Sequence, residues 1–255
     1  MKILILPRKT EAWDDLDPQK YYERHSKDGL DVHQQHGVLD WSEWALGDIN
    51  FRFNMDLWNK KRKLPFVKYR AEIKRIARKT WKKANLEPAD YVAGWPPNNF
   101  ENRSDDLILI PMDDDDWVAP TIKEELLQVF SDPKISIVIW DIWILDTMNN
   151  KWEYHAANRG VMPCAYAVRS SMSNTEIEHS HYLVTGLLPT TPHVLLHKPL
   201  SVYQVYPGST MVMRMYPFNA FRVKKIPHPP DLSWGHEEKE ELYKLNLKIK
   251  PPKIF

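Results

Sequence analysis

Cysteine is almost missing from this chain, which has a single one, Cys164, among 255 residues. One thiol excludes an internal disulfide framework and a cysteine-rich zinc site, and it is typical of the reducing cytoplasm. Long apolar runs are missing as well. The run at residues 3–6 is too short for a signal peptide, and no later run reaches the ~18 apolar residues of a membrane-spanning helix. We therefore expect a soluble, cytoplasmic protein.

An excess of charge of one sign is also lacking, since 35 Lys and Arg stand against 34 Asp and Glu. Whole-molecule charge therefore gives no reason to expect nucleic acid as a partner. Glycine is scarce, at 8 residues, whereas hydrophobic residues make up 43% and tryptophan reaches 11. This composition predicts a packed core. Tryptophan rings stack well on sugars, although most tryptophans in any domain serve in packing.

The apolar residues follow a pattern that predicts alternating strands and helices. Five apolar segments are typical of buried strands: residues 3–6, 107–112, 135–145, 164–169 and 200–206. Helices are expected within 59–83, after a capping box formed by Thr121 and Glu124, and near 236–245. Pro7 is expected to stop the first strand. This order predicts an α/β fold with a mostly parallel central sheet flanked by helices.

Residues 59–83 are strongly basic, with twelve Lys or Arg against one acid, Glu72. Their apolar residues recur at helical spacing, so the segment is expected to form an amphipathic helix with a cationic face. Such a face is most often simply solvated. The functional alternatives are a rim that faces phosphates, peripheral contact with an anionic membrane surface, or nucleic acid, for which no recognised motif accompanies the helix.

Four consecutive aspartates, at residues 113–116, follow the predicted strand 107–112. Adjacent carboxylates repel one another unless a cation neutralises them, and all-oxygen sites select hard cations such as Mg²⁺ or Mn²⁺. In an extended segment, Asp113 and Asp115 would point to the same side. The alternative is an acidic loop that precedes a helix, where the helix dipole favours negative charge. Two acids would be enough for that, and four favour a metal site.

The segment LILIPMDDDDWVAPTIKEEL resembles the hhhhDxDDxhxP pattern of GT-A-type glycosyltransferases, particularly small bacterial and viral rhamnosyltransferase-like proteins. The resemblance implies a Rossmann-like nucleotide-diphospho-sugar transferase domain over residues 1–206, with a C-terminal extension, 207–255, that carries a short helix. It implies a UDP-, GDP- or dTDP-sugar donor, a glycan or glycolipid acceptor, and Mn²⁺ or Mg²⁺ at the diphosphate. The residues that it assigns to the metal are Asp113, Asp115 and Asp116, and those that it assigns to the nucleotide sugar are Asp113, Asp114, Arg70 and Arg78.

The catalytic base of this family follows the strand that matches residues 164–169. Four candidates lie there, Glu176, Glu178, His179 and His181, of which we rank Glu178 and His181 first. The family's Gly-rich acceptor loop and its ED pair have no match in the chain. Two other functions use clustered aspartates: a metal-dependent phosphatase or other phosphoryl-transfer hydrolase, and a non-catalytic module that binds carbohydrate or cations.

Overall fold

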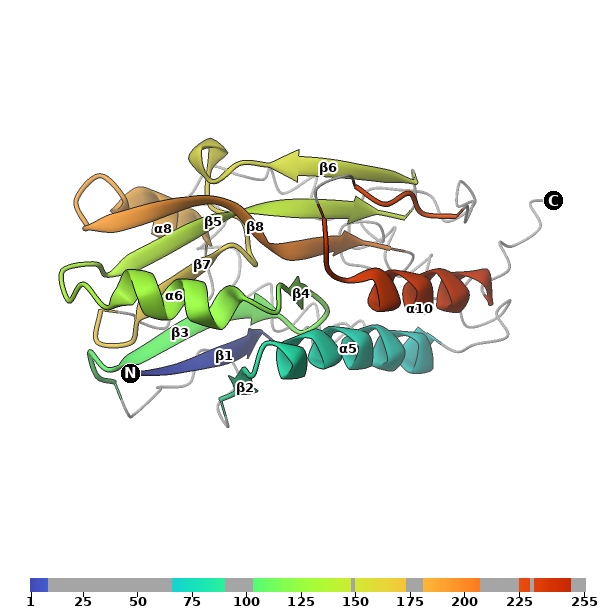
Figure 1. The fold of residues 1–255 in the computed structure, drawn as a ribbon, viewed down its shortest axis with the longest axis horizontal. Helices are drawn as coiled ribbons and strands as arrows, with labels where there is room; N and C mark the ends of the chain where they lie inside the picture. The colour runs from blue at the N-terminus through green and yellow to red at the C-terminus, as the bar shows by residue number, and fades with distance from the viewer. Residues whose placement is uncertain are drawn as a thin grey trace, which may run out of the picture.

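The computed structural model describes residues 1–8, 66–89, 103–147, 150–172, 181–206, 225–229 and 232–248. These residues form a mixed α/β structure in which helices flank a central sheet (Figure 1). The described helices are α5 (Phe66–Lys83), α6 (Ile122–Phe130), α8 (His181–Leu187) and α10 (His236–Leu247), together with a short 3₁₀ turn, η1 (Ala157–Arg159). The helices expected within 59–83, after Thr121 and near 236–245 are therefore confirmed, whereas α8 was not expected.

The described strands make one eight-stranded sheet with the order β2-β1-β3-β7-β5-β8-β4, in which β6 pairs with β5. Their bounds are β1 (Lys2–Arg8), β2 (Glu87–Pro88), β3 (Leu107–Asp113), β4 (Trp117–Val118), β5 (Ile137–Asp146), β6 (Lys151–His155), β7 (Tyr166–Arg169) and β8 (His193–Val205). Within the described sheet, β2, β1, β3, β5 and β8 run one way, whereas β4, β6 and β7 run the other way.

The antiparallel strand β7, which lies between β3 and β5, departs from the mostly parallel sheet that was expected. β8 pairs with the full length of β5 on one edge, so β6 and β7 share the other edge. The chain turns back after β5 and follows that edge, first as β6 and then as β7. Parallel neighbours need a crossover of a dozen or more residues, usually through a helix. Only residues 147–150 separate β5 from β6, too few for such a crossover, so β6 returns antiparallel to β5 and β7 continues in the direction of β6.

Both faces of the sheet are covered, as the near-continuous apolar strands predicted. One face packs against α5 and α6 and contains Ile5, Ile110 and Trp140 among its buried residues. The other face packs against α8 and contains Leu109 and Ile139. Alternate residues of β1, β3 and β5 therefore enter different cores, as the two-residue period of a strand requires.

The C-terminal helix α10 lies against the basic helix α5. Arg75, Lys79 and Lys83 of α5 form ion pairs with carboxylates of α10, and the shortest joins Lys79 Nζ to Glu241 Oε1 at 2.6 Å. The hydrogen bonds that Lys79 and Lys83 donate to these carboxylates raise the pKa of both lysines. Part of the cationic face of α5 is thus matched by acids of the same chain.

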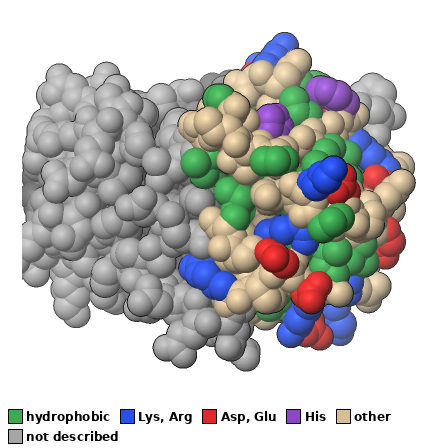
Figure 2. All heavy atoms as spheres, turned by 90° about the vertical axis from the view of Figure 1, so that its left-hand side faces the viewer, with side chains coloured by type: hydrophobic (Ala, Val, Ile, Leu, Met, Phe, Trp, Pro, Cys, Tyr) green, Lys and Arg blue, Asp and Glu red, His purple; other side chains and the backbone are tan. Residues whose placement is uncertain are grey.

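No described helix has both the length and the apolar character needed to cross a membrane. The face seen from the left-hand side of Figure 1 carries basic and acidic side chains intermixed with apolar ones (Figure 2).

Candidate metal centre

The aspartates lie where the order of the strands reverses. β1 has β2 on one edge and β3 on the other, and both neighbours run parallel to it. The backbone of Asp113, the last residue of β3, pairs with that of Arg8, the last residue of β1. In open α/β sheets, ligands bind beyond the carboxyl ends of strands at such a switch point. The aspartate loop occupies this place in the described sheet.

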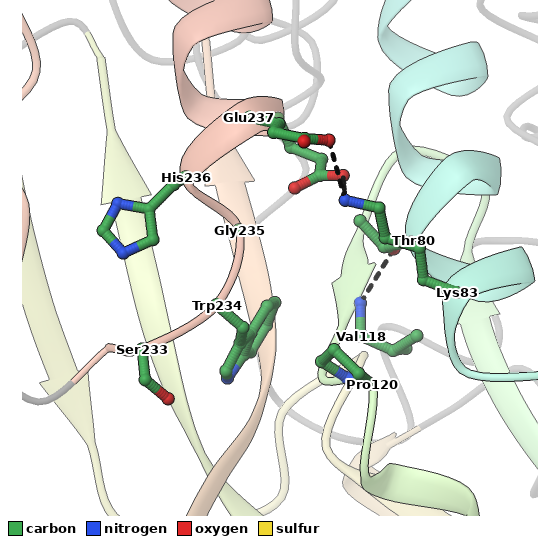
Figure 3. Close-up of a pocket in the computed structure, with 10 residues that line it drawn as sticks. Thr80, Lys83, Val118, Pro120, Ser233, Trp234, Gly235, His236 and Glu237 are labelled. Carbon is green, nitrogen blue, oxygen red and sulfur yellow. Dashed lines mark hydrogen bonds and ion pairs between the residues drawn. The ribbon is translucent and has the colours of Figure 1, made fainter.

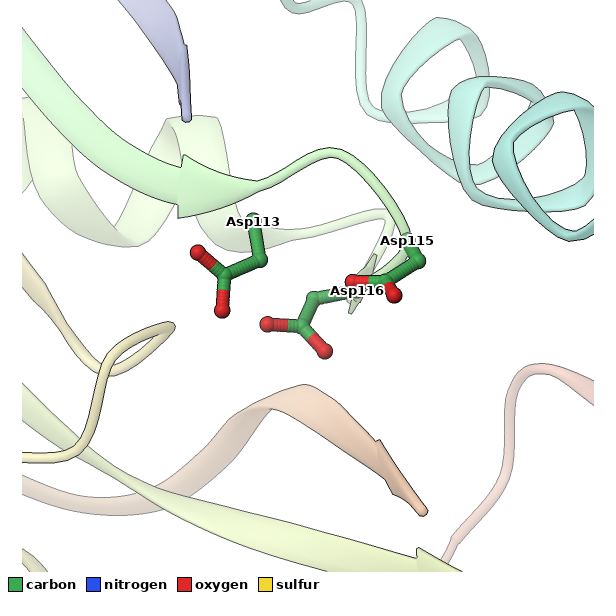
Figure 4. Close-up of side chains that lie close together, drawn as sticks. All are labelled: Asp113, Asp115 and Asp116. Carbon is green, nitrogen blue, oxygen red and sulfur yellow. The ribbon is translucent and has the colours of Figure 1, made fainter. Parts of the chain in front are cut away.

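A tight turn, rather than an extended segment, brings the carboxylates together. The backbone N–H of Asp116 donates to the carbonyl of Asp113 at 3.1 Å, which closes a turn across Asp114 and Asp115. Ligand oxygens of Asp113, Asp115 and Asp116 all lie within 4.8 Å of one another (Figure 4). The expectation that alternation along a strand would align Asp113 and Asp115 is wrong, because the strand ends at Asp113. The turn adds Asp116 to the cluster instead.

Asp114, the fourth acid, forms an ion pair with a lysine of α5. Lys74 Nζ of α5 lies 2.8 Å from Asp114 Oδ2, and both side chains are largely buried. Asp114, one of the four residues that the resemblance assigned to the nucleotide sugar, is therefore engaged in an ion pair within the chain. This pair leaves three clustered carboxylates in a largely buried setting, with Asp116 fully buried, Asp115 8% exposed and Asp113 half-buried.

The end of β8 forms a polar wall beside the cluster, which the sequence analysis did not identify. The Tyr206 hydroxyl donates to Asp115 Oδ2 at 2.6 Å, and the backbone N–H of Gln204 donates to Asp116 Oδ1 at 3.3 Å. The side-chain amide of Gln204 donates to the backbone carbonyl of Asp115. The only sequence signal was the strand at 200–206, which ends in polar and aromatic residues without any motif.

The hydroxyl of Tyr203, which lies within β8, is affected by the charge of the cluster. Burial raises the pKa of the Tyr203 hydroxyl well above 10.0, and the charges of the clustered aspartates raise it further. Ionised Tyr203 would place another negative charge beside carboxylates that already repel one another. Tyr203 therefore stays protonated at neutral pH and is a neutral neighbour of the cluster.

Helix α5 holds the aspartate loop from the other side. Trp81 Nε1 donates to the backbone carbonyl of Asp116 at 3.0 Å, and the Thr80 hydroxyl accepts from the backbone N–H of Val118 at 3.1 Å. The Thr80–Val118 bond borders a cavity of about 220 Å³ between α5 and the start of α10 (Figure 3). These two contacts bind the backbone of Asp116 and of Val118, on either side of Trp117. They hold the loop through its backbone, independently of what its carboxylates bind.

The other predicted site residues lie outside this cluster or outside the described side chains. Arg78 is exposed and lines a surface hollow near the end of α5, together with Lys82 and Lys123. Arg70 belongs to α5 and His181 begins α8, but neither side chain is among those described. Glu178 lies outside the described residues. Since α8 covers the face of the sheet opposite α5, the structure does not bring α8 together with the basic helix.

The donor set fits a hard divalent cation. Three carboxylates within one turn offer only oxygen ligands, which Mg²⁺ and Mn²⁺ prefer. Without a cation, three like charges in a largely buried setting repel one another.

Comparison with protein-family models finds none that matches the chain, and comparison with curated proteins finds no significant match.

Proposed function

We propose that the protein is a glycosyltransferase with a GT-A fold, which moves a sugar from a nucleotide-diphosphate donor to a hydroxyl acceptor on a glycan or glycolipid. Asp113, Asp115 and Asp116 would hold Mn²⁺ or Mg²⁺ in this function. The observation that carries the proposal is the convergence of these carboxylates at the strand switch point, within 4.8 Å of one another. It is supported by the resemblance of residues 107–126 to the family's aspartate motif.

The residues of the site have separable roles in this proposal. Asp113 is the most exposed of the clustered acids, so it would contact the incoming donor. Asp115 is held by a hydrogen bond from Tyr206 and Asp116 by one from Gln204 of β8, so their carboxylates would keep their places as the donor binds. A divalent cation held there would stabilise the negative charge that develops on the departing nucleoside diphosphate. Glu178 or His181 would take the proton of the acceptor hydroxyl.

The structure changes what we propose for the basic helix. Arg75, Lys79 and Lys83 pair with α10, and Lys74 pairs with Asp114, so these four cations are engaged in ion pairs within the chain. Phosphate or membrane contact would therefore fall to the remaining cations, including the exposed Lys68 and Arg78. A role in binding the donor is the one that the resemblance supports.

A thermal-shift panel of UDP-, GDP- and dTDP-sugars, each with and without Mn²⁺, tests the proposal. A ligand at a hundredfold excess over its dissociation constant stabilises the native state by about 2.7 kcal/mol. At about 2–4 °C per kcal/mol, this is a shift of several degrees. We expect at least one nucleotide sugar to raise the melting temperature only when Mn²⁺ is present.

The Asp113→Asn variant should lose this Mn²⁺-dependent shift, whereas Asp132→Asn should keep it. Asp132 is exposed at the end of α6, and its side chain accepts a backbone hydrogen bond that asparagine can also accept. A wild-type protein in which Mn²⁺ has no effect on any nucleotide sugar would contradict the proposal.

A further inference from the structure

Tyr206 occupies an unusual place for a tyrosine hydroxyl. It directly follows β8, is fully buried, and donates to Asp115 Oδ2 at 2.6 Å. Its ring packs edge-on against Tyr69 of α5, with 6.0 Å between ring centroids and 66° between ring planes. The Tyr69 hydroxyl in turn donates to the side chain of Asn246 in α10. A buried chain of contacts thus connects the C-terminal helix to one carboxylate of the aspartate cluster.

The hydrogen bond to Oδ2 restricts what Asp115 can do. A carboxylate on a turn rotates readily about its terminal torsion, which is broad and roughly two-fold. A donor fixed at Oδ2 selects one orientation of the Asp115 carboxylate. Hydrogen bonds of this kind behind a ligating residue typically contribute 10–100-fold to metal affinity.

We propose that Tyr206 is a positioning residue of the metal centre, which holds the Asp115 carboxylate in its metal-binding orientation. The inference rests on the proposed function, because it assumes that the cluster binds a divalent cation. Tyr206 does not touch the cation in this role. It acts through Asp115, and its own position is fixed by the ring of Tyr69, which Asn246 anchors.

The variant Tyr206→Phe removes the hydroxyl and keeps the ring that packs against Tyr69. Titration of the full chain with Mn²⁺, followed by electron paramagnetic resonance of free and bound Mn²⁺, measures its effect. We expect the dissociation constant for Mn²⁺ to rise about tenfold or more, in line with the loss of such a supporting hydrogen bond. The spectrum of the bound Mn²⁺ should also change, because the Asp115 carboxylate that binds it is no longer held in one orientation.

Tyr154→Phe is the matched control. The Tyr154 hydroxyl also donates to a buried aspartate, Asp141, which lies in the middle of β5 and outside the cluster. The two variants make the same chemical change next to different carboxylates. The Mn²⁺ affinity of Tyr154→Phe should equal that of the wild type, which separates a local effect on Asp115 from a general loss of stability.

Three outcomes decide the inference. A wild type that binds Mn²⁺ and a Tyr206→Phe variant that binds it equally well overturn the role of Tyr206 and leave the metal centre intact. A wild type that binds neither Mn²⁺ nor Mg²⁺ overturns the metal centre as well.

Should Tyr206→Phe lack a cooperative melting transition, Tyr69→Phe supplies the test, because it frees the ring behind Tyr206 from Asn246. Weaker Mn²⁺ binding by that variant supports the inference, and unchanged binding overturns it.

Discussion

Replacing Asp115 by Asn should have opposite effects on stability without and with a divalent cation. The three clustered carboxylates lie within 4.8 Å of one another. At that distance and an effective dielectric constant of about 20, each pair of like charges costs roughly 3–4 kcal/mol. Screening by solvent at the half-buried Asp113 reduces this figure. We expect Asp115→Asn to raise the free energy of unfolding by about 1–3 kcal/mol in EDTA, or a few degrees in melting temperature.

Mn²⁺ should reverse this order. The wild type gains about 4.1 kcal/mol at a thousandfold excess of Mn²⁺ over its dissociation constant, whereas the variant has lost a ligand and gains little. The asparagine carbonyl can still accept from Tyr206, so the packing of the site is retained. Differential scanning calorimetry of both proteins, in EDTA and in Mn²⁺, makes the comparison.

Asp141→Asn is the control for loss of a buried carboxylate. Asp141 is fully buried and accepts from the Tyr154 hydroxyl and from the backbone N–H of Ala157, the latter at 2.6 Å. It lies outside the cluster, so its replacement should lower stability equally with and without Mn²⁺. The reasoning is refuted if Asp115→Asn is less stable than the wild type in EDTA and Mn²⁺ stabilises both proteins equally.

Three further predictions concern the surroundings of the site. Burial alone would raise the pKa of Glu241, but hydrogen bonds from Lys79 and Arg75 hold it below the ordinary 4.5. Burial lowers the pKa of His236 from 6.5. Both groups therefore add stability that is lost as pH falls, below 6.5 for His236 and below 4.5 for Glu241, which melting curves from pH 7 to 3 will detect. Replacing Lys74 by Met breaks its pair with the buried Asp114 and should cost about 3–5 kcal/mol in denaturant unfolding, most of which Asp114→Asn in the same chain should restore. Arg169→Lys should cost about 2–4 kcal/mol by the same assay, because the buried guanidinium donates to four backbone carbonyls, those of residues 105, 130, 132 and 135, which an ammonium cannot all reach.

The apolar segments allowed the main elements of the fold to be predicted from the sequence. The buried runs at 107–112 and 135–145 became β3 and β5, because a strand covered on both faces must be apolar throughout. Pro7 was wrongly expected to end the first strand. The carbonyl of Ile5 accepts from Ala89 on the β2 side, and Pro7, two residues later, faces the same side. β2 pairs with β1 only at Leu4 and Ile5, so the missing N–H of Pro7 costs no ladder bond there.

The capping box shows a limit of local motifs. Helix α6 begins at Ile122 as expected, but Thr121 makes no side-chain capping hydrogen bond. Its backbone has already the helical conformation, with φ −91° and ψ −1°, whereas a capping residue is usually extended. The helix is held instead by burial of Ile122, Leu126 and Phe130.

The site itself was predictable only in part. The run of aspartates pointed to the loop in which three carboxylates converge, because adjacent carboxylates repel one another unless a cation neutralises them. It did not reveal that Asp114 would turn toward Lys74, since the direction of each side chain depends on the turn that closes at Asp116. The contribution of Gln204 and Tyr206 comes from pairing between distant strands and helices, which no local pattern in the sequence encodes.

Hydrolysis of a nucleotide sugar in ¹⁸O-water tests the central claim most directly. Glycosyl transfer to water breaks the bond between the anomeric carbon and the phosphate oxygen, whereas a metal-dependent phosphatase attacks phosphorus. We predict slow, Mn²⁺-stimulated release of intact UDP, GDP or dTDP from at least one nucleotide sugar. Mass spectrometry of the products should find the ¹⁸O label on the sugar. Label on phosphate would contradict the assignment of the aspartate cluster to glycosyl transfer and would favour the phosphoryl-transfer hydrolase.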